Sequence, residues 1–318
     1  MILLIIAGIL LVLTLIIAYI CFRLTFYVRK SQKNCLDEYP IPDGEIYEPW
    51  RDTMVNWMKE TRTLPHQKYS IRSFDGLTLQ AKFYEYAPGV TIELMLHGYR
   101  GSAERDLCGG VQRCFALGHS ALIVDQRGCG HSDGNVITFG IREHLDCLKW
   151  VEFLIKNFGS DVKIILTGIS MGAATVLMAA GQPLPANVIG VLADCGYTSA
   201  KEIIKVVMRQ IKLPPNLAYP FVKLGALIFG GFNLDKESPI SAVSKCKIPV
   251  IFYHGESDNF VPCYMSTENY DACTSRKQLV TIPGAGHGLS YLVDPEKYLS
   301  TLKTFFSEET AELPNSNT

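Results

Sequence analysis

A regular alternation of short apolar runs with longer stretches of helical periodicity most constrains the fold of this chain. The apolar runs have the length of strands and occupy residues 91–98, 121–128, 162–168, 188–195, 248–255 and 278–284. The helical stretches between them occupy residues 102–118, 141–159 and 171–181. Strands that alternate with helices predict a mostly parallel sheet with helices on both faces, and therefore an α/β fold.

The third apolar run leads into a serine flanked by glycines, Gly168-Ile169-Ser170-Met171-Gly172. Binding sites in parallel sheets form at the carboxyl ends of the strands, so Ser170 stands where a site is expected. A strand-to-helix turn that strains a nucleophile needs small flanking residues, and Gly168 and Gly172 meet that need. The alternative is a serine in a tight turn without a chemical role, because so short a pattern also arises by chance.

Two further strand ends carry an acid and a base. Asp258 follows the fifth apolar run, and His287 follows the sixth within a glycine-rich loop. A serine hydroxyl needs a base to take its proton, and His287 is the candidate base. Asp258 would orient its imidazole, and the chain order Ser170, Asp258, His287 is the one expected after an elbow of this kind. A solvated loop histidine and a helix-capping aspartate are the structural alternatives.

Five motifs occur in sequence order: HGYRGS, DQRGCGHSDG, GISMGA, HGESDNFVP and GAGHG. Together they resemble the α/β-hydrolase-fold serine hydrolases, most of all the membrane-anchored branch related to prolyl oligopeptidase, dienelactone hydrolase and the acyl-protein-thioesterase-like hydrolases. The resemblance covers about residues 69–306. It implies a mostly parallel central sheet with helices on both faces and a small helical cap. The motifs are specific for the fold and the triad, but not for a substrate.

The resemblance also implies an oxyanion hole made of two backbone N–H groups, those of Tyr99 and Met171. Each such donor stabilises a tetrahedral oxyanion by about 3 kcal/mol. The Tyr99 hydroxyl could serve the site instead, or its ring could form a wall of the acyl pocket. Relatives with an aspartate nucleophile are excluded because the elbow carries Ser170. We expect neither a metal ion nor a cofactor, since no ligand cluster and no dinucleotide-binding glycine motif is visible.

The segment 196–246 separates two predicted core strands by about fifty residues, which is unusually long for a connection. It contains an amphipathic stretch at 200–213 and a strongly apolar stretch at 216–232. By resemblance, this segment is a helical cap with apolar walls over the site. Helices that merely pack on the domain, and an apolar face that touches a membrane, are the alternatives. The sequence leaves all three open.

The first 22 residues contain no charged side chain. At 1.5 Å per helical residue such a segment spans about 30 Å, enough for the core of a bilayer. A cleaved signal peptide would carry basic residues before the apolar run and small residues at a cleavage site, and neither is present. The sequence therefore predicts one transmembrane anchor at residues 1–22.

The orientation of the anchor follows from the charges after it. Arg23, Arg29, Lys30 and Lys33 precede the first acidic residue, Asp37. The positive-inside rule then places the catalytic domain in the cytoplasm. The ten cysteines form no C-x-x-C pair, which agrees with a reducing compartment and with the absence of a zinc motif.

The remaining segments are divided as follows. Residues 23–67 form a juxtamembrane linker with a packing helix, because Trp50, Met54, Trp57 and Met58 share one helical face. A β-hairpin around Asp75-Gly76 opens the hydrolase domain, predicted at 68–307. The polar residues 308–318 form a disordered tail.

The predicted function is a serine hydrolase that cleaves a carboxylic ester or thioester through an acyl-serine intermediate. Its substrate is expected to be a small-molecule ester, a thioester or a lipid-like molecule. A serine peptidase of the oligopeptidase or aminopeptidase type and a non-catalytic binding protein on a hydrolase scaffold are the alternatives. Nucleic acid is not an expected partner, because the formal net charge is −1 and no basic patch is interleaved with aromatic residues.

Overall fold

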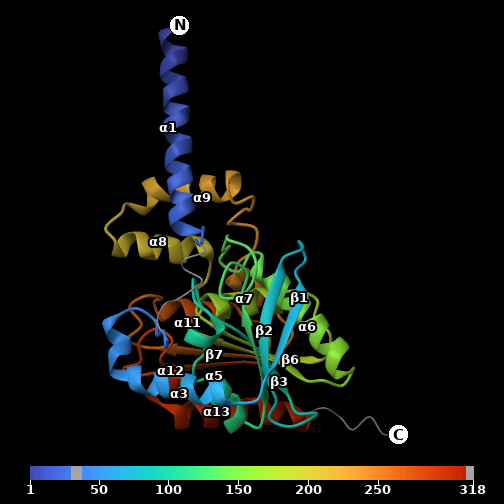
Figure 1. Cartoon of the computed structure of the whole chain (residues 1–318). Helices are drawn as coiled ribbons and strands as arrows, with labels where there is room; N and C mark the ends of the chain where they lie inside the picture. Colours follow the sequence, from blue (N-terminus) through green and yellow to red (C-terminus); the bar gives the residue numbers. More distant parts are fainter. Residues whose placement is uncertain (30–37, 313–318) are drawn as a thin grey trace.

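The computed structural model of the chain describes residues 1–29 and 38–312, with side chains described up to residue 307 (Figure 1). A single long helix, α1 (Ile2–Thr25), projects away from the rest of the molecule, which is built around one sheet. Lys30, Lys33 and Cys35 lie outside the described residues, as do residues 313–318 of the predicted tail. Residues 308–312 were predicted to be disordered, but their backbone continues the last helix, α13 (Pro295–Glu312).

The eight strands form one sheet in the order β1-β2-β4-β3-β5-β6-β7-β8. Their bounds are β1 Gln67–Arg72, β2 Thr78–Tyr84, β3 Ile92–Leu96, β4 Ser120–Asp125, β5 Ile164–Ile169, β6 Val188–Asp194, β7 Val250–Gly255 and β8 Lys277–Ile282. The first two strands form the predicted hairpin, and β2 pairs antiparallel with β4. All later pairs are parallel, which confirms the predicted sheet.

Helices cover both faces of the sheet. They are α3 Arg51–Thr63, α4 Ala103–Asp106, α5 Gly110–Ala116, α6 Glu143–Phe158, α7 Met171–Ala180, α8 Ala200–Gln210, α9 Pro215–Ile228, α10 Pro239–Val243, α11 Tyr264–Ala272, α12 Ser290–Val293 and α13, with a 3₁₀ turn, η1, at Glu45–Trp50. Alternate residues of β5 show the two layers. Ile164 and Leu166 pack with Trp150 of α6, whereas Ile165 packs in the other layer with Met58 of α3.

One predicted helix, over residues 102–118, is broken into α4 and α5. The break contains Gly109 and Gly110, and glycine is a poor helix former. A Cβ on Gly109 would lie 2.5 Å from the ring of Trp57, so the glycine allows α3 to approach closely. The predicted packing of α3 on the domain is confirmed, because Met54 and Met58 are buried.

A buried ionic cluster joins β3 to α5 and to β5. Glu93 pairs with Arg113 and also accepts hydrogen bonds from His119 at 2.9 Å and from the Thr167 hydroxyl at 2.8 Å. Burial alone would raise the pKa of the Glu93 carboxyl, but the charge of Arg113 and the contact with His119 hold that pKa well below its usual range. The carboxylate is therefore ionised in the folded protein at neutral pH.

We expect Glu93→Gln to lower the free energy of unfolding by about 3 kcal/mol, because it leaves the Arg113 guanidinium buried without a counter-charge. Glu152→Gln, which removes an exposed i,i+3 pair with Lys149, is the matched control and should change stability by less than about 0.5 kcal/mol. Urea denaturation of both variants measures the difference. Equal stabilities would contradict a structural role for the Glu93 cluster.

In the predicted cap segment, α9 packs across the base of α1 and α8 packs on α9 (Figure 1). The backbones of α1 and α9 come close, since a Cβ on Gly225 would lie 2.4 Å from the Ala18 carbonyl oxygen. Phe22 and Phe26 are buried in the same cluster as Val222 and Phe232 of the cap segment. The end of α1 therefore packs against the segment that was predicted to form the cap.

By length and composition α1 can cross a membrane, and it is the one helix among the described residues that can. It fits a single-pass anchor, although a signal sequence near an N-terminus has the same length and composition. The nine described cysteines are free of disulfides.

Candidate active site

Ser170 occupies a strained turn between β5 and α7. Its backbone has φ 56° and ψ −117°, in the left-handed range of φ that side chains rarely adopt. Its N–H donates to the Asp194 carbonyl oxygen at 2.8 Å. A Cβ on Gly172 would lie 2.0 Å from the Leu96 carbonyl oxygen, and one on Gly168 would lie 2.2 Å from the Gly172 backbone. The flanking glycines are therefore a steric requirement of the turn.

The structure brings Ser170, His287 and Asp258 together from the ends of three strands. The Ser170 hydroxyl lies 2.9 Å from His287 Nε2, and Asp258 Oδ2 lies 2.7 Å from His287 Nδ1. Ser170 and Asp258 are buried, and the His287 side chain is 12% exposed. This arrangement can pass a proton from the hydroxyl to an imidazole that is held by a carboxylate.

Asp258 is fixed by its own loop. Its Oδ1 accepts hydrogen bonds from the N–H groups of Phe260 and Val261, each at 2.9 Å, and its Oδ2 also lies 3.3 Å from His254 Nε2. Both N–H groups lie before α11, whose N-cap is Cys263. The alternative prediction, that Asp258 caps this helix, is therefore wrong. Burial alone would raise the pKa of the Asp258 carboxyl, but hydrogen bonds from His254 and His287 hold that pKa well below its usual range. The acid is therefore a charged partner for His287 at neutral pH.

Two backbone N–H groups were predicted to form the oxyanion hole. That of Met171 is the first in α7, where helix geometry provides no intrahelical acceptor. Tyr99 lies in the turn after β3, where the Gly98 N–H donates to Asp106 Oδ2 at 3.0 Å and Arg100 has φ 53°. A Cβ on Gly98 would lie 3.8 Å from the Ser170 hydroxyl oxygen, so this turn runs beside the elbow.

The side chain of Tyr99 points to α1. Its hydroxyl donates to the Thr25 carbonyl oxygen at 2.6 Å, so the structure does not support the alternative that this hydroxyl serves the oxyanion. Arg100 donates to the carbonyl oxygens of Leu24 at 2.8 Å and Tyr27 at 3.0 Å. The end of α1 is therefore bonded to the turn that carries the Tyr99 amide.

Comparison with known proteins identifies the fold. Residues 94–238 match the sequence profile of the alpha/beta hydrolase fold. The chain has the α/β-hydrolase fold. It superposes on the Pyrococcus furiosus esterase Pf2001 with a TM-score of 0.65 and 23% identity, covering 85% of this chain and 96% of the esterase. It superposes on Est1E from Butyrivibrio proteoclasticus with a TM-score of 0.58 and 22% identity, covering 77% of this chain and 100% of Est1E.

Two curated relatives extend the similarity. The uncharacterised protein YqkD of Bacillus subtilis is 28% identical over 190 residues, which are 59% of this chain and 62% of YqkD. The chain thus spans less than two thirds of that relative. The protein bem46 of Schizosaccharomyces pombe is 25% identical over 298 residues, which are 91% of this chain and 90% of bem46.

The loop that carries His287 in this α/β-hydrolase fold is held by contacts that the sequence does not reveal. The Tyr47 hydroxyl, from the predicted linker, donates to the His287 carbonyl oxygen at 3.0 Å. Asp194, at the end of β6, accepts from the Ser290 hydroxyl at 3.0 Å and the Tyr298 hydroxyl at 3.1 Å. Asp194 stood at a predicted strand end, which was a usable signal, whereas nothing local marked Tyr47.

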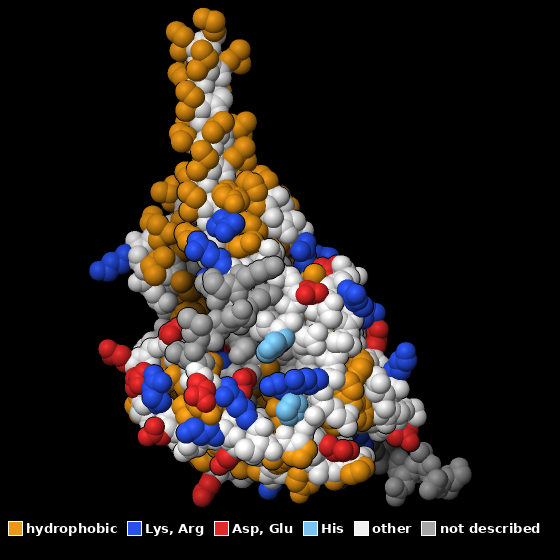
Figure 2. All heavy atoms as spheres, viewed as in Figure 1, with side chains coloured by type: hydrophobic (Ala, Val, Ile, Leu, Met, Phe, Trp, Pro, Cys, Tyr) orange, Lys and Arg blue, Asp and Glu red, His pale blue; other side chains and the backbone are white. Residues whose placement is uncertain are grey.

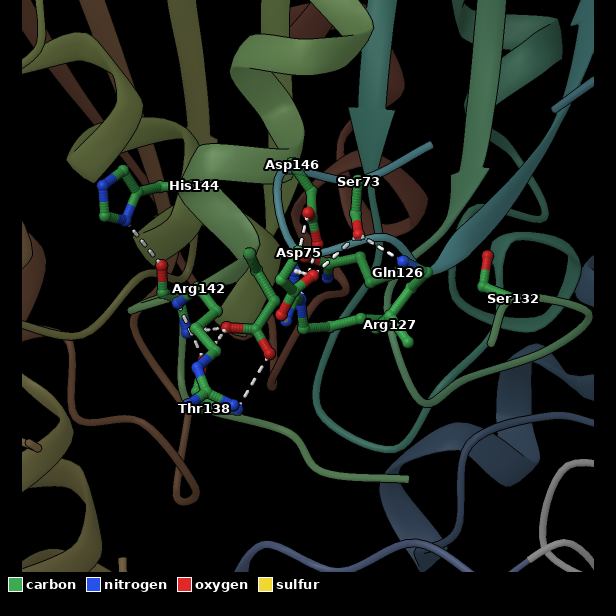
Figure 3. A network of polar contacts seen from close by, with 12 residues as sticks. Ser73, Asp75, Gln126, Arg127, Ser132, Thr138, Arg142, His144 and Asp146 are labelled. Atoms are coloured by element: carbon green, nitrogen blue, oxygen red, sulfur yellow. Dashed lines mark hydrogen bonds and ion pairs between the residues drawn. The ribbon is translucent and has the colours of Figure 1, made fainter. Parts of the chain in front are cut away.

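Away from Ser170, Asp258 and His287, a polar network braces the loop after β4 of the sheet. Arg127 donates to both oxygens of Asp146, at 2.6 and 2.7 Å, and to both oxygens of Asp75, at 2.9 and 3.1 Å. Figure 3 shows the two aspartates converging on Arg127 from α6 and from the hairpin turn. These contacts hold Arg127, and with it the loop after β4, between α6 and the hairpin turn.

One group of described residues has donor atoms spaced closely enough to share a metal ion: Cys195, Asp258 and His287, within 4.8 Å of one another. The hydrogen bond between Asp258 and His287 already accounts for the approach of those two. Burial raises the pKa of the Cys195 thiol, which disfavours the thiolate that a metal needs. The residues present therefore fit a relay better than a metal centre, and the expected absence of a cofactor stays a prediction.

Proposed function

We propose that this chain is a serine hydrolase that cleaves a carboxylic ester or thioester through an acyl-serine intermediate. The esterase-like structural neighbours support a hydrolase of this general type. The observation that carries the proposal is the continuous relay from Ser170 through His287 to Asp258, with contacts of 2.9 and 2.7 Å.

Acylation uses the relay in one direction. The Ser170 oxygen attacks the carbonyl carbon of the substrate while His287 Nε2 takes the hydroxyl proton. The resulting oxyanion is held by the N–H groups of Met171 and Tyr99, which together would stabilise the transition state by about 6 kcal/mol. His287 then gives its proton to the departing alcohol or thiol, which leaves an ester on Ser170. Asp258 keeps the proton of the neutral imidazole on Nδ1, so that Nε2 is free to act as the base.

Deacylation repeats the cycle with water. His287 takes a proton from the water, whose oxygen attacks the acyl-serine carbonyl. The same two amides hold the second oxyanion, and collapse returns the proton from His287 to Ser170. The products are a carboxylic acid and the free enzyme.

The surroundings favour an apolar substrate group. The Phe260 ring lies 5.1 Å from the His287 ring and is 43% exposed. The Tyr99 ring packs on Phe139 at 5.1 Å, beside the turn that carries the Tyr99 amide. Apolar rings around the relay suit an acyl or aromatic moiety better than a charged one.

We further propose that α1 is retained as an anchor, with the hydrolase domain in the cytoplasm. Removal of α1 as a signal peptide would take Phe22 out of the domain core, and Phe26 directly after the helix is fully buried. Arg23 and Arg29 follow the apolar run, as the positive-inside rule requires of a cytoplasmic side.

A fluorophosphonate probe tests both proposals in one experiment. We expect a membrane-permeant probe to label the wild-type protein at Ser170 and to leave Ser170→Ala unlabelled. A membrane-impermeant probe should label it only after the cells are lysed. Absence of labelling in folded wild-type protein would overturn the enzymatic proposal in favour of a binding protein. Labelling of intact cells by the impermeant probe would overturn only the cytoplasmic placement.

The same preparation separates esterase from peptidase action. We expect turnover of p-nitrophenyl esters, with a dependence on acyl length, and much slower turnover of aminoacyl-p-nitroanilides. The opposite order would assign the relay to a peptidase.

A further inference from the structure

The outer face of α9 is apolar and exposed. Leu217, Leu227 and Ile228 are 69%, 56% and 49% exposed, while the inner face buries Tyr219 and Val222 in the cap. Lys223 is the one charged residue of α9, and its ammonium pairs with Asp235 of the following loop. Apart from that pair, both faces of α9 are rich in apolar side chains, which is typical of helices inside a protein or in lipid. The preceding loop adds two more exposed apolar residues, Ile211 and Leu213. Such a continuous patch marks an interaction surface.

This patch is continuous with α1. Tyr19 of α1 meets Phe229 at the end of α9 with ring centroids 5.1 Å apart, and Gly225 crosses α1 at Ala18. Close crossings at small residues are typical of helices packed within membranes. Figure 2 shows hydrophobic side chains along α1 and around its base, with basic side chains directly beside them.

The position of the crossing sets the depth of α9. Ala18 and Phe22, which α9 contacts, precede Arg23, the first charged residue after the apolar run. A charged side chain at the end of a membrane span lies at the boundary between the acyl chains and the headgroups. The crossing at Ala18 is five residues earlier, which is about 7.5 Å along the helix. If α1 spans a bilayer, α9 lies at the apolar side of that boundary.

A basic stripe runs along α8, the helix that packs against α9. Lys201, Lys205 and Arg209 follow one another at intervals of four residues and therefore share one helical face, and Lys212 comes just after the helix. Glu202 is the one acidic residue of α8. A basic face beside an apolar one is the composition of helices that lie in the surface of anionic membranes.

We propose that the α8–α9 segment is a second membrane contact, in which the exposed face of α9 enters the bilayer that α1 crosses and the basic stripe meets anionic headgroups. The inference rests on the anchor proposed above, and it does not depend on the proposed reaction. It selects one of the three roles that the sequence left open for this segment. The domain is then held at the lipid surface by both α1 and the α8–α9 segment. Two contacts fix its tilt relative to the membrane as well as its distance from it.

Tryptophan reporters in the full-length chain test the contact. Leu227→Trp and Leu217→Trp place a fluorophore on the exposed face, and Tyr86→Trp at the far end of the hairpin is the matched control, since Tyr86 is 52% exposed. Each variant is reconstituted in vesicles of phosphatidylcholine and phosphatidylglycerol with or without brominated acyl chains. An in-plane helix lies about 5–10 Å below the headgroups, so the α9 reporters should be quenched several-fold more than the control. Emission of the wild-type tryptophans is subtracted.

Three outcomes decide the proposal. Equal quenching of the α9 reporters and Tyr86→Trp would overturn the membrane contact. If the emission of Leu227→Trp shows burial that increases with protein concentration, without quenching by bromolipid, the apolar patch binds a second copy of the chain. That result would overturn the membrane contact. Leu227→Trp should be quenched less in pure phosphatidylcholine than in the mixed vesicles, and less in a Lys201→Glu, Arg209→Glu background. If the quenching is the same in all three cases, only the proposed contact between the basic stripe and anionic headgroups is overturned. All three readouts are independent of hydrolysis, so they separate this inference from the proposed function.

Discussion

Ser170→Ala is expected to lower kcat on a p-nitrophenyl ester by about 10⁴- to 10⁶-fold, because no other group is placed to form the acyl intermediate. The variant keeps the two amides proposed for the oxyanion hole, so a small residual rate above the uncatalysed reaction should persist. KM should change far less than kcat, since the methyl group leaves the surrounding walls in place.

The matched control is Ser300→Ala, which removes the hydroxyl of an exposed serine on α13. It should retain wild-type kcat and KM. If Ser170→Ala kept more than about a tenth of the wild-type kcat, the nucleophile assignment would be wrong. Circular dichroism of both variants shows whether the elbow still folds, and the strained backbone of Ser170 gives no reason to expect that alanine is worse there than serine.

Asp258→Asn is the second large effect, with an expected fall in kcat of about 10⁴-fold. The asparagine carbonyl oxygen can keep the hydrogen bonds from the Phe260 and Val261 amides. Its NH₂ group then faces His287 Nδ1 and donates to it, which moves the imidazole proton to Nε2. A protonated Nε2 cannot accept the Ser170 proton, so the base is lost although the geometry is retained.

The same variant has a signature in the pH dependence of stability. Because the folded pKa of Asp258 is depressed, its contribution is present above the unfolded carboxyl pKa of about 3.9 and is lost as the pH falls from there towards the folded value. Between pH 5 and pH 2, the free energy of unfolding should therefore fall more for the wild-type protein than for Asp258→Asn. The difference is about the contribution of the ionised Asp258 carboxylate. Asp161→Asn, an exposed acid before β5, is the control and should behave as wild type. An Asp258→Asn variant with wild-type kcat would contradict the relay.

The sheet could be predicted from the sequence because its signals are local. Each core strand is a short apolar run ending in a turn, as in Ile164–Ile169, and each crossover has helical periodicity. The positions of Ser170, Asp258 and His287 followed from the same pattern, since parallel strands end at a common edge. The break between α4 and α5 has a local signal in Gly109 and Gly110, but the contact with Trp57 that requires a glycine there is tertiary.

The supports of the site could not be predicted, because they join distant segments. The hydrogen bond from Tyr47 to His287 spans 240 residues of sequence, and that from Tyr99 to Thr25 spans 74. No periodicity encodes such contacts. The packing between the anchor and the domain is hidden for a related reason. Phe22 and Phe26 are as apolar as the membrane segment before them, and packing on residues 222–232 and on Phe139 makes them part of the core.

The bonds between the end of α1 and the Tyr99–Arg100 turn have a mechanical consequence. A bilayer thicker or thinner than the apolar length of α1 pushes the helix along the membrane normal or tilts it. The carbonyl oxygens of Leu24, Thr25 and Tyr27 would move with it, and three side-chain hydrogen bonds tie them to the turn that carries an oxyanion amide. With α1 as the proposed anchor and Tyr99 as the proposed oxyanion donor, acyl-chain length and sterol content of the host membrane would become variables of the chemical step, even for a substrate that never enters the lipid.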